Sequence, residues 1–279
     1  MSISGGMPRA VERALAVQAT ALQVFCKSSN QWRARPFAPG EAEEFREAAR
    51  RAGLAEHVLS HCNYLINLAS PDDVLWERSK AAFAEELDRC AELGIPAAVL
   101  HPGSHVGSGV DAGIARVCAA LDEVVGRRGG AERDVRVLLE ITAGQGSNLG
   151  SSFEELARIL EGSRRSDQLG VCFDTCHALA AGYEFRDAGS FRDLWERFDR
   201  AIGIERLGAF HLNDSTHDLG SRKDRHQHIG RGFVGLDAFR LILNDRRFES
   251  LPMVLETEKG DDLAEDRINL GILRDLLAQ

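Results

Sequence analysis

Short apolar segments alternate with amphipathic segments along most of the chain. The apolar segments are four to six residues long and rich in Val, Leu and Ile, as expected for strands that are buried on both faces of a parallel sheet. We predict strands at Leu22–Cys26, Val58–His61, Ala97–His101, Arg136–Ile141, Gly170–Asp174, Leu207–His211 and Pro252–Glu256.

The intervening segments repeat their apolar residues with the period of helices that pack against a sheet. We predict helices at Pro8–Val17, Glu41–Arg51, Pro71–Leu93, Ala112–Val125, Phe153–Leu160, Phe191–Ala201, Leu236–Leu243 and Asp262–Leu277. Repeated strand–helix units predict the α/β class and a (β/α)8 TIM barrel, here as one domain spanning residues 1–279. The Gly129–Gly130 pair is typical of a turn between two elements.

The seven predicted strands are one fewer than a closed barrel needs. The missing strand should precede Ser4, but the helical pattern from Pro8 begins almost at once. We therefore expect the barrel to lack its first strand and to have a gap between the Leu22–Cys26 and Pro252–Glu256 strands. An upstream coding segment lost through a start codon assigned too late would explain the gap, unless Met1–Ser4 fills it.

Composition indicates a folded chain, with 44% hydrophobic and 28% charged residues. No apolar run reaches the roughly 18 residues of a membrane helix, so we expect a cytoplasmic protein without membrane contact. The six cysteines lack CxxC pairing, which favours buried reduced thiols. A formal charge of −9 argues against binding nucleic acid over a broad basic face, but bound divalent cations would offset part of that charge.

Most predicted strands end in a side chain that can bind a metal. These residues are His61, His101, Glu140, Asp174, His211 and Glu256. Three more follow in adjacent loops, namely His177, Asp224 and His226. The carboxyl ends of parallel barrel strands share one rim, so these nine side chains should converge. A single histidine or carboxylate in such a place is more often only hydrogen-bonded or solvated, but five of the chain's nine histidines falling there indicates a metal cluster.

Several local sequences also match a known family. The segments are HCNYLINL, LHPGSH, EITAGQGSNLG, CFDTCHALAAGY, FHLNDS, GSRKDRHQHIG and VLET, in the family's order and spacing. On these segments, and from about Ser4 to the carboxyl end, the chain resembles the endonuclease IV family. The resemblance implies a TIM barrel with three metal ions, usually zinc with Mn²⁺ possible in part. It also implies hydrolysis of the DNA phosphodiester 5′ to an abasic site, which leaves a 3′ hydroxyl.

The resemblance assigns the nine side chains to three metal positions. His61 and His101 would hold one ion, which Glu140 would bridge to a second ion held by Asp174, His211 and Glu256. The third ion would bind His177, Asp224 and His226. On this reading the catalytic carboxylates are Glu140, Asp174 and Glu256. Metal ions can activate water and neutralise the charge of the transition state, so no protein nucleophile is needed.

The same resemblance suggests residues that contact DNA. Tyr64 and Leu65 match residues that press into DNA at the lesion, and apolar wedges of this kind kink a duplex. The loop from Lys27 to Arg35 offers Trp32 among basic side chains. Arg222 and Arg225, with Lys223 between them, are expected phosphate contacts. The expected partner is double-stranded DNA containing abasic sites, bound by a monomer.

The chain departs from the family pattern in four places. The first strand is missing, Asn30 replaces an arginine that intercalates in some members, and Ile141 replaces an asparagine found in many. The fourth departure is Gly230–Arg231–Gly232, where other members have a GEG-type turn. These departures bear on the fold and on DNA distortion, but they leave all nine ligands in place.

Two alternatives remain open. A metal-dependent sugar isomerase or epimerase shares the barrel and the rim metal site, but it would leave the loop ligands His177, Asp224 and His226 without a role. A catalytically weak protein that binds damaged DNA would fit an incomplete barrel, although loss of catalysis would relax the need for the full ligand set. Metal content per chain would distinguish an isomerase or epimerase from the endonuclease. An incision assay on abasic DNA would distinguish a binding protein from the endonuclease.

Overall fold

Seven parallel strands form the sheet at the centre of the fold, in the order β1-β2-β3-β4-β5-β6-β9. The computed structural model describes residues 1–29, 31–126 and 135–278, so Asn30 and the predicted Gly129–Gly130 turn lie outside the described residues. The strands are β1 (Leu22–Val24), β2 (Val58–His61), β3 (Ala97–Leu100), β4 (Arg136–Glu140), β5 (Leu169–Asp174), β6 (Leu207–His211) and β9 (Met253–Val254). All seven predicted strands are therefore present, with ends that differ by up to two residues.

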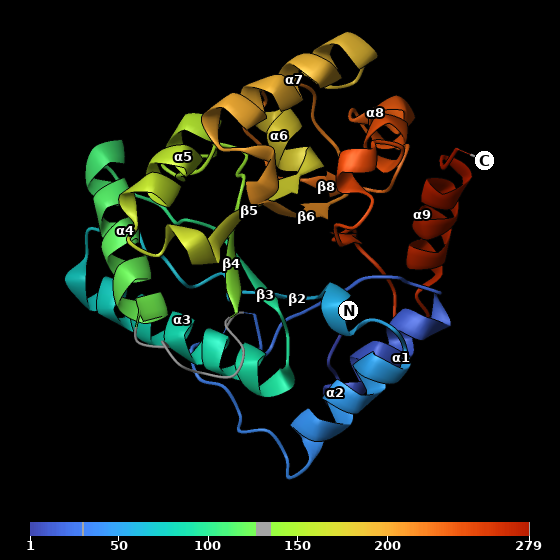
Figure 1. The fold of residues 1–279 in the computed structure, drawn as a ribbon, viewed down its shortest axis with the longest axis horizontal. Coiled ribbons are helices and arrows are strands. Elements are labelled where there is room, and N and C mark those ends of the chain that lie inside the picture. Colours follow the sequence, from blue (N-terminus) through green and yellow to red (C-terminus); the bar gives the residue numbers. More distant parts are fainter. Residues whose placement is uncertain (30, 127–134, 279) are drawn as a thin grey trace.

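Helices surround the strands on the outside, as Figure 1 shows for α3, α4, α5 and α7. Their bounds are α1 (Pro8–Ala16), α2 (Glu41–Arg51), α3 (Asp73–Leu93), α4 (Val110–Gly126), α5 (Phe153–Gly162), α6 (Thr175–Ala181), α7 (Ala188–Ala201), α8 (Gly235–Leu243) and α9 (Ala264–Asp275). The short helix α6, directly after β5, is an addition to the predicted set. Among the described helices, none is both long and apolar enough to cross a bilayer.

The ends of the longest helix follow from local chemistry. The Asp72 side chain accepts a hydrogen bond from the Leu75 amide at 2.8 Å, which caps the first turn of α3. At the other end Gly94 adopts a φ of +68°, a left-handed conformation that glycine allows at low cost. The chain then enters β3 within three residues, so the helix lies antiparallel to the strands that flank it.

Two apolar clusters make up the core. The larger cluster lies between the sheet and the helices, and it includes Leu100, Val137 and Phe173. The smaller cluster fills the interior of the barrel, with members Leu59, Ala97, Val99, Leu138, Cys172, Ala209 and Val254. All six cysteines are free, and only Cys118 is not fully buried, which agrees with the expected reduced thiols. The filled interior supports the strand ends from below, as in other barrels of this kind.

The barrel is nearly closed, with an unsealed seam between β1 and β9. Within the described chain, β1 pairs only with β2 and β9 pairs only with β6. A cavity of about 370 Å³ occupies the seam, lined by both strands and by Met1 and Ser2. The Met1 amino group donates a hydrogen bond to the Gln23 carbonyl, and burial lowers its pKa to about 5. The expected gap is therefore confirmed, and the first residues enter it without forming a strand.

The outer side of the seam is covered by helix contacts. Arg274 of α9 donates to the carbonyl oxygens of Val17 and Gln18, at 3.2 and 2.7 Å. Figure 1 accordingly shows α1 and α9 on the same side of the barrel. The seam is thus bridged through helices and side chains, while β1 and β9 do not pair with each other.

Candidate metal centre

The strands deliver most of the predicted ligands to one rim of the barrel. His61, Glu140, Asp174 and His211 are the last residues of β2, β4, β5 and β6. His101 directly follows β3, and Glu256 lies two residues beyond β9. His177 lies in α6, while Asp224 and His226 belong to a hairpin formed by β7 (Asp214–Ser215) and β8 (His226–Gln227). These nine residues are called the metal centre below.

The first group consists of His61, His101 and Glu140. The Nε2 atoms of His61 and His101 lie 3.1 and 2.9 Å from the same oxygen of Glu140, Oε2. The Nδ1 atom of His61 lies 2.7 Å from the Cys62 carbonyl oxygen, which can only accept, so this nitrogen carries the proton. The Nε2 lone pair is then free to bind a metal ion, which is the usual arrangement of a ligating histidine.

The second group gathers around the other oxygen of Glu140. His211 Nδ1 lies 2.8 Å from Glu140 Oε1, 3.1 Å from Glu256 Oε2 and 3.7 Å from Asp174 Oδ2. Ligand atoms of these four residues lie within 4.8 Å of one another. Glu140 therefore turns one carboxylate oxygen toward each group, which is the geometry of a carboxylate that bridges two cations.

The third group is formed by His177, Asp224 and His226. His177 Nε2 lies 3.1 Å from Asp224 Oδ1, and His226 Nε2 lies 3.5 Å from the same oxygen. His177 Nδ1 donates to the Ile141 carbonyl at 2.9 Å, so the histidine depends on the backbone of residue 141 and not on its side chain. Replacement of the family asparagine by Ile141 therefore leaves this ligand oriented.

Asp174 links the second and third groups. Its Oδ1 atom accepts from the His177 amide at 2.8 Å and so caps α6, which places His177 above the end of β5. Its Oδ2 atom accepts from Asn213 at 2.6 Å and lies 3.7 Å from His226 Nε2. One carboxylate thus starts the helix that carries a neighbouring ligand.

Electrostatics show why this arrangement fits cations. Glu140 and Asp174 are fully buried, and in the described chain their ion-pair partners are histidines. Burial alone would raise the pKa of Glu140, but His211 and His101 hold it well below its ordinary value. Burial would lower the pKa of His177, whereas Asp174 and Asp224 raise it well above the usual range. Buried carboxylates need compensating positive charge, which divalent cations can provide.

The hydrogen-bond pattern gives a second sign of the same fit. The Nε2 atoms of His177 and His226 are buried, and neither makes a hydrogen bond of acceptable geometry in the described structure. Both nitrogens instead lie close to the same carboxylate oxygen, Asp224 Oδ1. Buried polar atoms without hydrogen bonds are uncommon, and a shared metal ion would satisfy both.

Tyr64 stands beside the first group at the rim. Its side chain is 59% exposed, and its ring centroid lies 5.3 Å from that of His61 and 6.3 Å from that of His101. Leu65 next to it is half-buried. An exposed aromatic ring within reach of the metal centre matches the expected wedge, and the contact of both residues with DNA remains a prediction.

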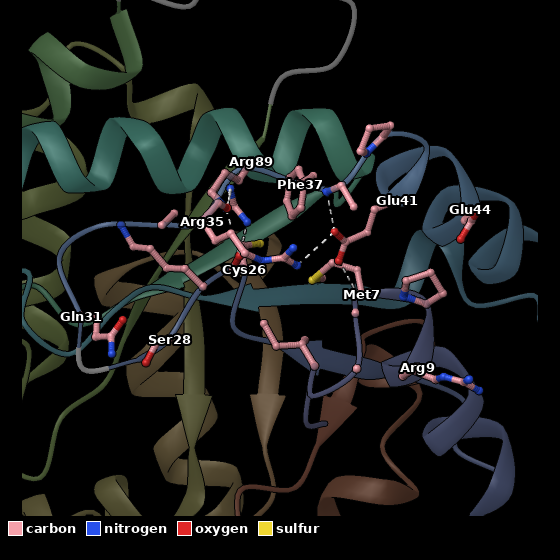
Figure 2. Close-up of a pocket in the computed structure, with 18 of the residues that line it drawn as sticks. Met7, Arg9, Cys26, Ser28, Gln31, Arg35, Phe37, Glu41, Glu44 and Arg89 are labelled. Carbon is pink, nitrogen blue, oxygen red and sulfur yellow. Dashed lines mark hydrogen bonds and ion pairs between the residues drawn. The ribbon is translucent and has the colours of Figure 1, made fainter.

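The segment from Lys27 to Gly40, called the rim loop below, is anchored at several points. Arg89 of α3 donates to the Cys26 carbonyl at 2.8 Å and to the Arg35 carbonyl at 3.1 Å, and its guanidinium lies over the Phe37 ring. Glu41 accepts from the amides of Met7 and Ala38, at 3.0 and 2.8 Å. Figure 2 shows Arg89, Phe37 and Glu41 among the residues that line a cavity of about 900 Å³ between this loop and the N-terminal segment.

One prediction for the rim loop needs correction. Lys27 is not available to DNA, because its side chain is only 2% exposed and its ammonium group lies 2.7 Å from Glu85 and 3.6 Å from Glu86. It also donates to the Trp32 carbonyl at 3.3 Å, so it fixes the loop from beneath. Trp32 is half-buried and stacked under Arg78, which covers one face of its ring. Its contact with DNA stays a prediction.

The hairpin loop between β7 and β8 presents the other basic residues. Arg222 and Lys223 are exposed, and so is Arg225. The Arg222 amide donates to the Ala180 carbonyl at 2.9 Å, which ties the loop to the end of α6. Basic side chains thus flank Asp224 and His226 without filling the metal centre, as phosphate contacts would.

The Gly230–Arg231–Gly232 turn is held through its backbone. Asp214 Oδ2 accepts from the amides of Gly230 and Gly232, at 2.9 and 3.0 Å. A Cβ atom at Gly232 would lie 2.2 Å from the Ser215 carbonyl oxygen, so this position has room only for glycine. The side chain of Arg231 takes no part in these contacts, so the departure from the family pattern leaves the turn intact.

Three residues around the site were not identified from the sequence. Gln23 lies between His211 and Glu256, and Asn213 donates to Asp174 and accepts from the Glu256 amide at 2.8 Å. Asn63 donates to the carbonyl oxygens of Ser28 and Gln31, both at 2.8 Å. Asn63 and Asn213 each lie two residues beyond a predicted ligand, and that position is the signal that could have indicated them.

Comparison with known proteins agrees with this geometry. The family described as "Xylose isomerase-like TIM barrel" matches residues 11–275. A protein named "Probable endonuclease 4" from Chloroflexus aurantiacus is 50% identical over 99% of this chain and 96% of its own length. A protein of the same name from Trichlorobacter lovleyi is 49% identical over 99% of this chain and 97% of its own length. The crystal structure of endonuclease IV from Thermus thermophilus is 38% identical, with a TM-score of 0.84 over 97% of this chain and 94% of that one. The chain therefore belongs to the endonuclease IV family of DNA-repair enzymes.

Proposed function

We propose that this endonuclease hydrolyses the phosphodiester on the 5′ side of abasic sites in double-stranded DNA, acting as a monomer that binds three divalent ions, chiefly Zn²⁺. The single observation that carries the proposal is the placement of Glu140 between two ligand groups. Its Oε2 atom lies 3.1 and 2.9 Å from two imidazoles, while its Oε1 atom lies 2.8 Å from a third. Five imidazoles and four carboxylates make a donor set that suits Zn²⁺, and Mn²⁺ is compatible with the carboxylate-rich part.

The reaction consists of one displacement at phosphorus. The oxygen of a water molecule forms a bond to phosphorus, the P–O3′ bond breaks, and O3′ takes up a proton to become the 3′ hydroxyl. Bound divalent ions would lower the pKa of the attacking water and neutralise charge that develops on the phosphate oxygens. The chain's own task is to hold the carboxylates of Glu140, Asp174 and Glu256 in fixed positions, since these side chains would place the cations that the displacement needs.

Selection of the abasic site is assigned to the rim. Tyr64 and Leu65 would enter the duplex where a base is missing, because the energetic cost of unstacking is lowest there. Trp32 would contact the strand from the rim loop, and Arg222 and Arg225 would bind the phosphates beside the third group. Local contacts of this kind suit a chain with a formal charge of −9, which cannot attract DNA over its whole surface.

The test combines metal analysis with an incision assay on a duplex that contains one abasic analogue. We expect three ions per chain, cleavage only at the analogue, a 3′ hydroxyl product, and loss of cleavage after chelation. An intact duplex of the same sequence is the control substrate. One or two ions with activity on a sugar would support an isomerase instead, and tight binding without a cut would support a recognition protein.

A further inference from the structure

Gln23 occupies an unusual place between the unsealed seam and the metal centre. It lies on β1 and is only 9% exposed, with its side chain pointing to the second ligand group. Its amide nitrogen donates to Glu256 Oε1 at 2.7 Å. Its amide oxygen lies 2.8 Å from His211 Nε2. Both ends of one buried amide therefore contact predicted ligands that come from two other strands.

The contact with His211 fixes which ring nitrogen carries the proton. His211 Nδ1 faces Glu140, Glu256 and Asp174, so it is the nitrogen that must offer a lone pair to a cation. Nε2 must then carry the proton, and the amide oxygen of Gln23 accepts it. Ligating histidines regularly depend on such a partner for their ring orientation and tautomer.

The contact with Gln23 gives the two carboxylate oxygens of Glu256 different partners. Oε1 accepts from the Gln23 amide, while Oε2 lies 3.1 Å from His211 Nδ1 and faces the second group. An amide is the side chain that can accept at one end and donate at the other. A carboxylate in its place would still accept from His211, but it would repel Glu256.

The position of this bridge adds to its importance. Glu256 follows β9 and Gln23 lies on β1, and the backbones of these two strands are not paired with each other. At every other strand boundary that separates ligands, ladder hydrogen bonds set the spacing. Across the seam, the hydrogen bond from the Gln23 side chain to Glu256 sets the spacing instead.

We propose that Gln23 is a positioning residue for the second metal group, which holds Glu256 across the seam and fixes the tautomer of His211. The proposal rests on the proposed function, because it assumes that these side chains bind metal ions. Residues that support ligands in this way typically contribute about 10- to 100-fold to metal affinity.

The test is Gln23→Met in the full chain, since methionine keeps the length of the side chain and removes both hydrogen bonds. Ion affinity is measured by competition with a chromophoric chelator, using Zn²⁺ and Co²⁺, and the visible spectrum of the Co²⁺ form reports ligand geometry. We expect one of three ions to bind about 10- to 100-fold more weakly, with an altered Co²⁺ spectrum and two ions unchanged. The control is Gln168→Met, at the opposite end of the barrel before β5.

A Gln23→Met variant with wild-type ion affinity and an unchanged spectrum would overturn the proposal. Thermal melting of the metal-free proteins checks that the variant is folded at the assay temperature. If it is not, Gln23→Glu serves with the same readouts, because repulsion of Glu256 should also alter the Co²⁺ spectrum. A wild-type chain that binds no ions and cuts no abasic DNA would instead defeat the proposed function, so the two failures are distinct.

Discussion

The metal centre and the rim loop lie at the same end of the barrel, yet different forces hold them in place. Six of the nine predicted ligands lie on or just after barrel strands, so the sheet ladder sets their spacing. The described residues of the rim loop form no such ladder. It depends on side chains that reach backbone groups, chiefly Asn63, Lys27 and Arg89.

This difference separates chemistry from recognition. The centre contains concentrated buried charge that only a rigid frame can keep in position, because each misplaced carboxylate would cost several kcal/mol. The rim loop is tied at separate points, so single contacts can be removed without disturbing the centre. We therefore expect substitutions in the two regions to affect different measurements, and the variants below test this expectation.

The largest effect is expected for Glu140→Gln. A neutral amide cannot bridge two cations as a carboxylate does, so cleavage should fall by about a thousandfold or more while the protein stays folded. Incision of abasic duplex and a circular dichroism spectrum measure the two quantities. Glu161→Gln, an exposed residue on α5, is the matched control. Incision by Glu140→Gln at a near wild-type rate would contradict the proposed bridging role of Glu140.

Lys27→Met should act on stability and leave the electrostatics of DNA binding unchanged. Removing the ammonium group takes a cation away from Glu86, which is 1% exposed, and breaking a buried ion pair typically costs about 3–5 kcal/mol. Denaturant unfolding measures this cost.

The exposed Lys223→Met variant should keep its stability and change DNA binding instead. Losing one phosphate contact should reduce the slope of log affinity against log salt concentration by about 0.9. If Lys27→Met changes the salt dependence of DNA binding and Lys223→Met does not, then Lys27 contacts DNA and our interpretation of Lys27 as a buried anchor is wrong.

Tyr64→Ala should weaken binding to abasic DNA by about 5- to 100-fold, because stacking on an aromatic ring contributes about 1–3 kcal/mol per base. The proposed three ions should remain bound, since the ring borders His61 and His101 without hydrogen bonding to them. Affinities for abasic and intact duplexes, with metal content, provide the measurement. Equal preference for the abasic duplex in variant and wild type would contradict the wedge role.

The smallest effect is expected for Asn63→Asp. The change keeps the oxygen that accepts from the Leu65 amide but replaces both donor hydrogens that hold Ser28 and Gln31. The loss of two such hydrogen bonds should raise KM for abasic DNA by about tenfold, with kcat and metal content near wild type. A fall in kcat with unchanged KM would show that Asn63 serves the centre and not the loop.

The sequence predicted the centre better than the loop for a physical reason. A strand end has a defined position on a barrel, so apolar runs that end in His61, Glu140 or His211 were enough to predict convergence. Gln23 acts through contacts between segments distant in sequence, and local pattern does not encode such distances. The position of Asn63 two residues after His61 could have placed it near the site, but it does not reveal the partners of Asn63 in the rim loop. Lys27 was misread for the same cause, because its burial depends on α3, which brings Glu85 and Glu86 beneath the loop.

The unsealed seam also has a consequence for the motions of the native state. β1 is held by three residue pairs with β2 on one side, and its other edge borders a cavity. Elements with few backbone partners open locally at the lowest free energy, so amide hydrogens of β1 should exchange with solvent faster than those of the fully flanked β4 and β5. Because Gln23 lies on this strand, each local opening would also break its contacts with His211 and Glu256. The opening of one edge strand would then influence how readily the second metal group loses the ion that we propose for it.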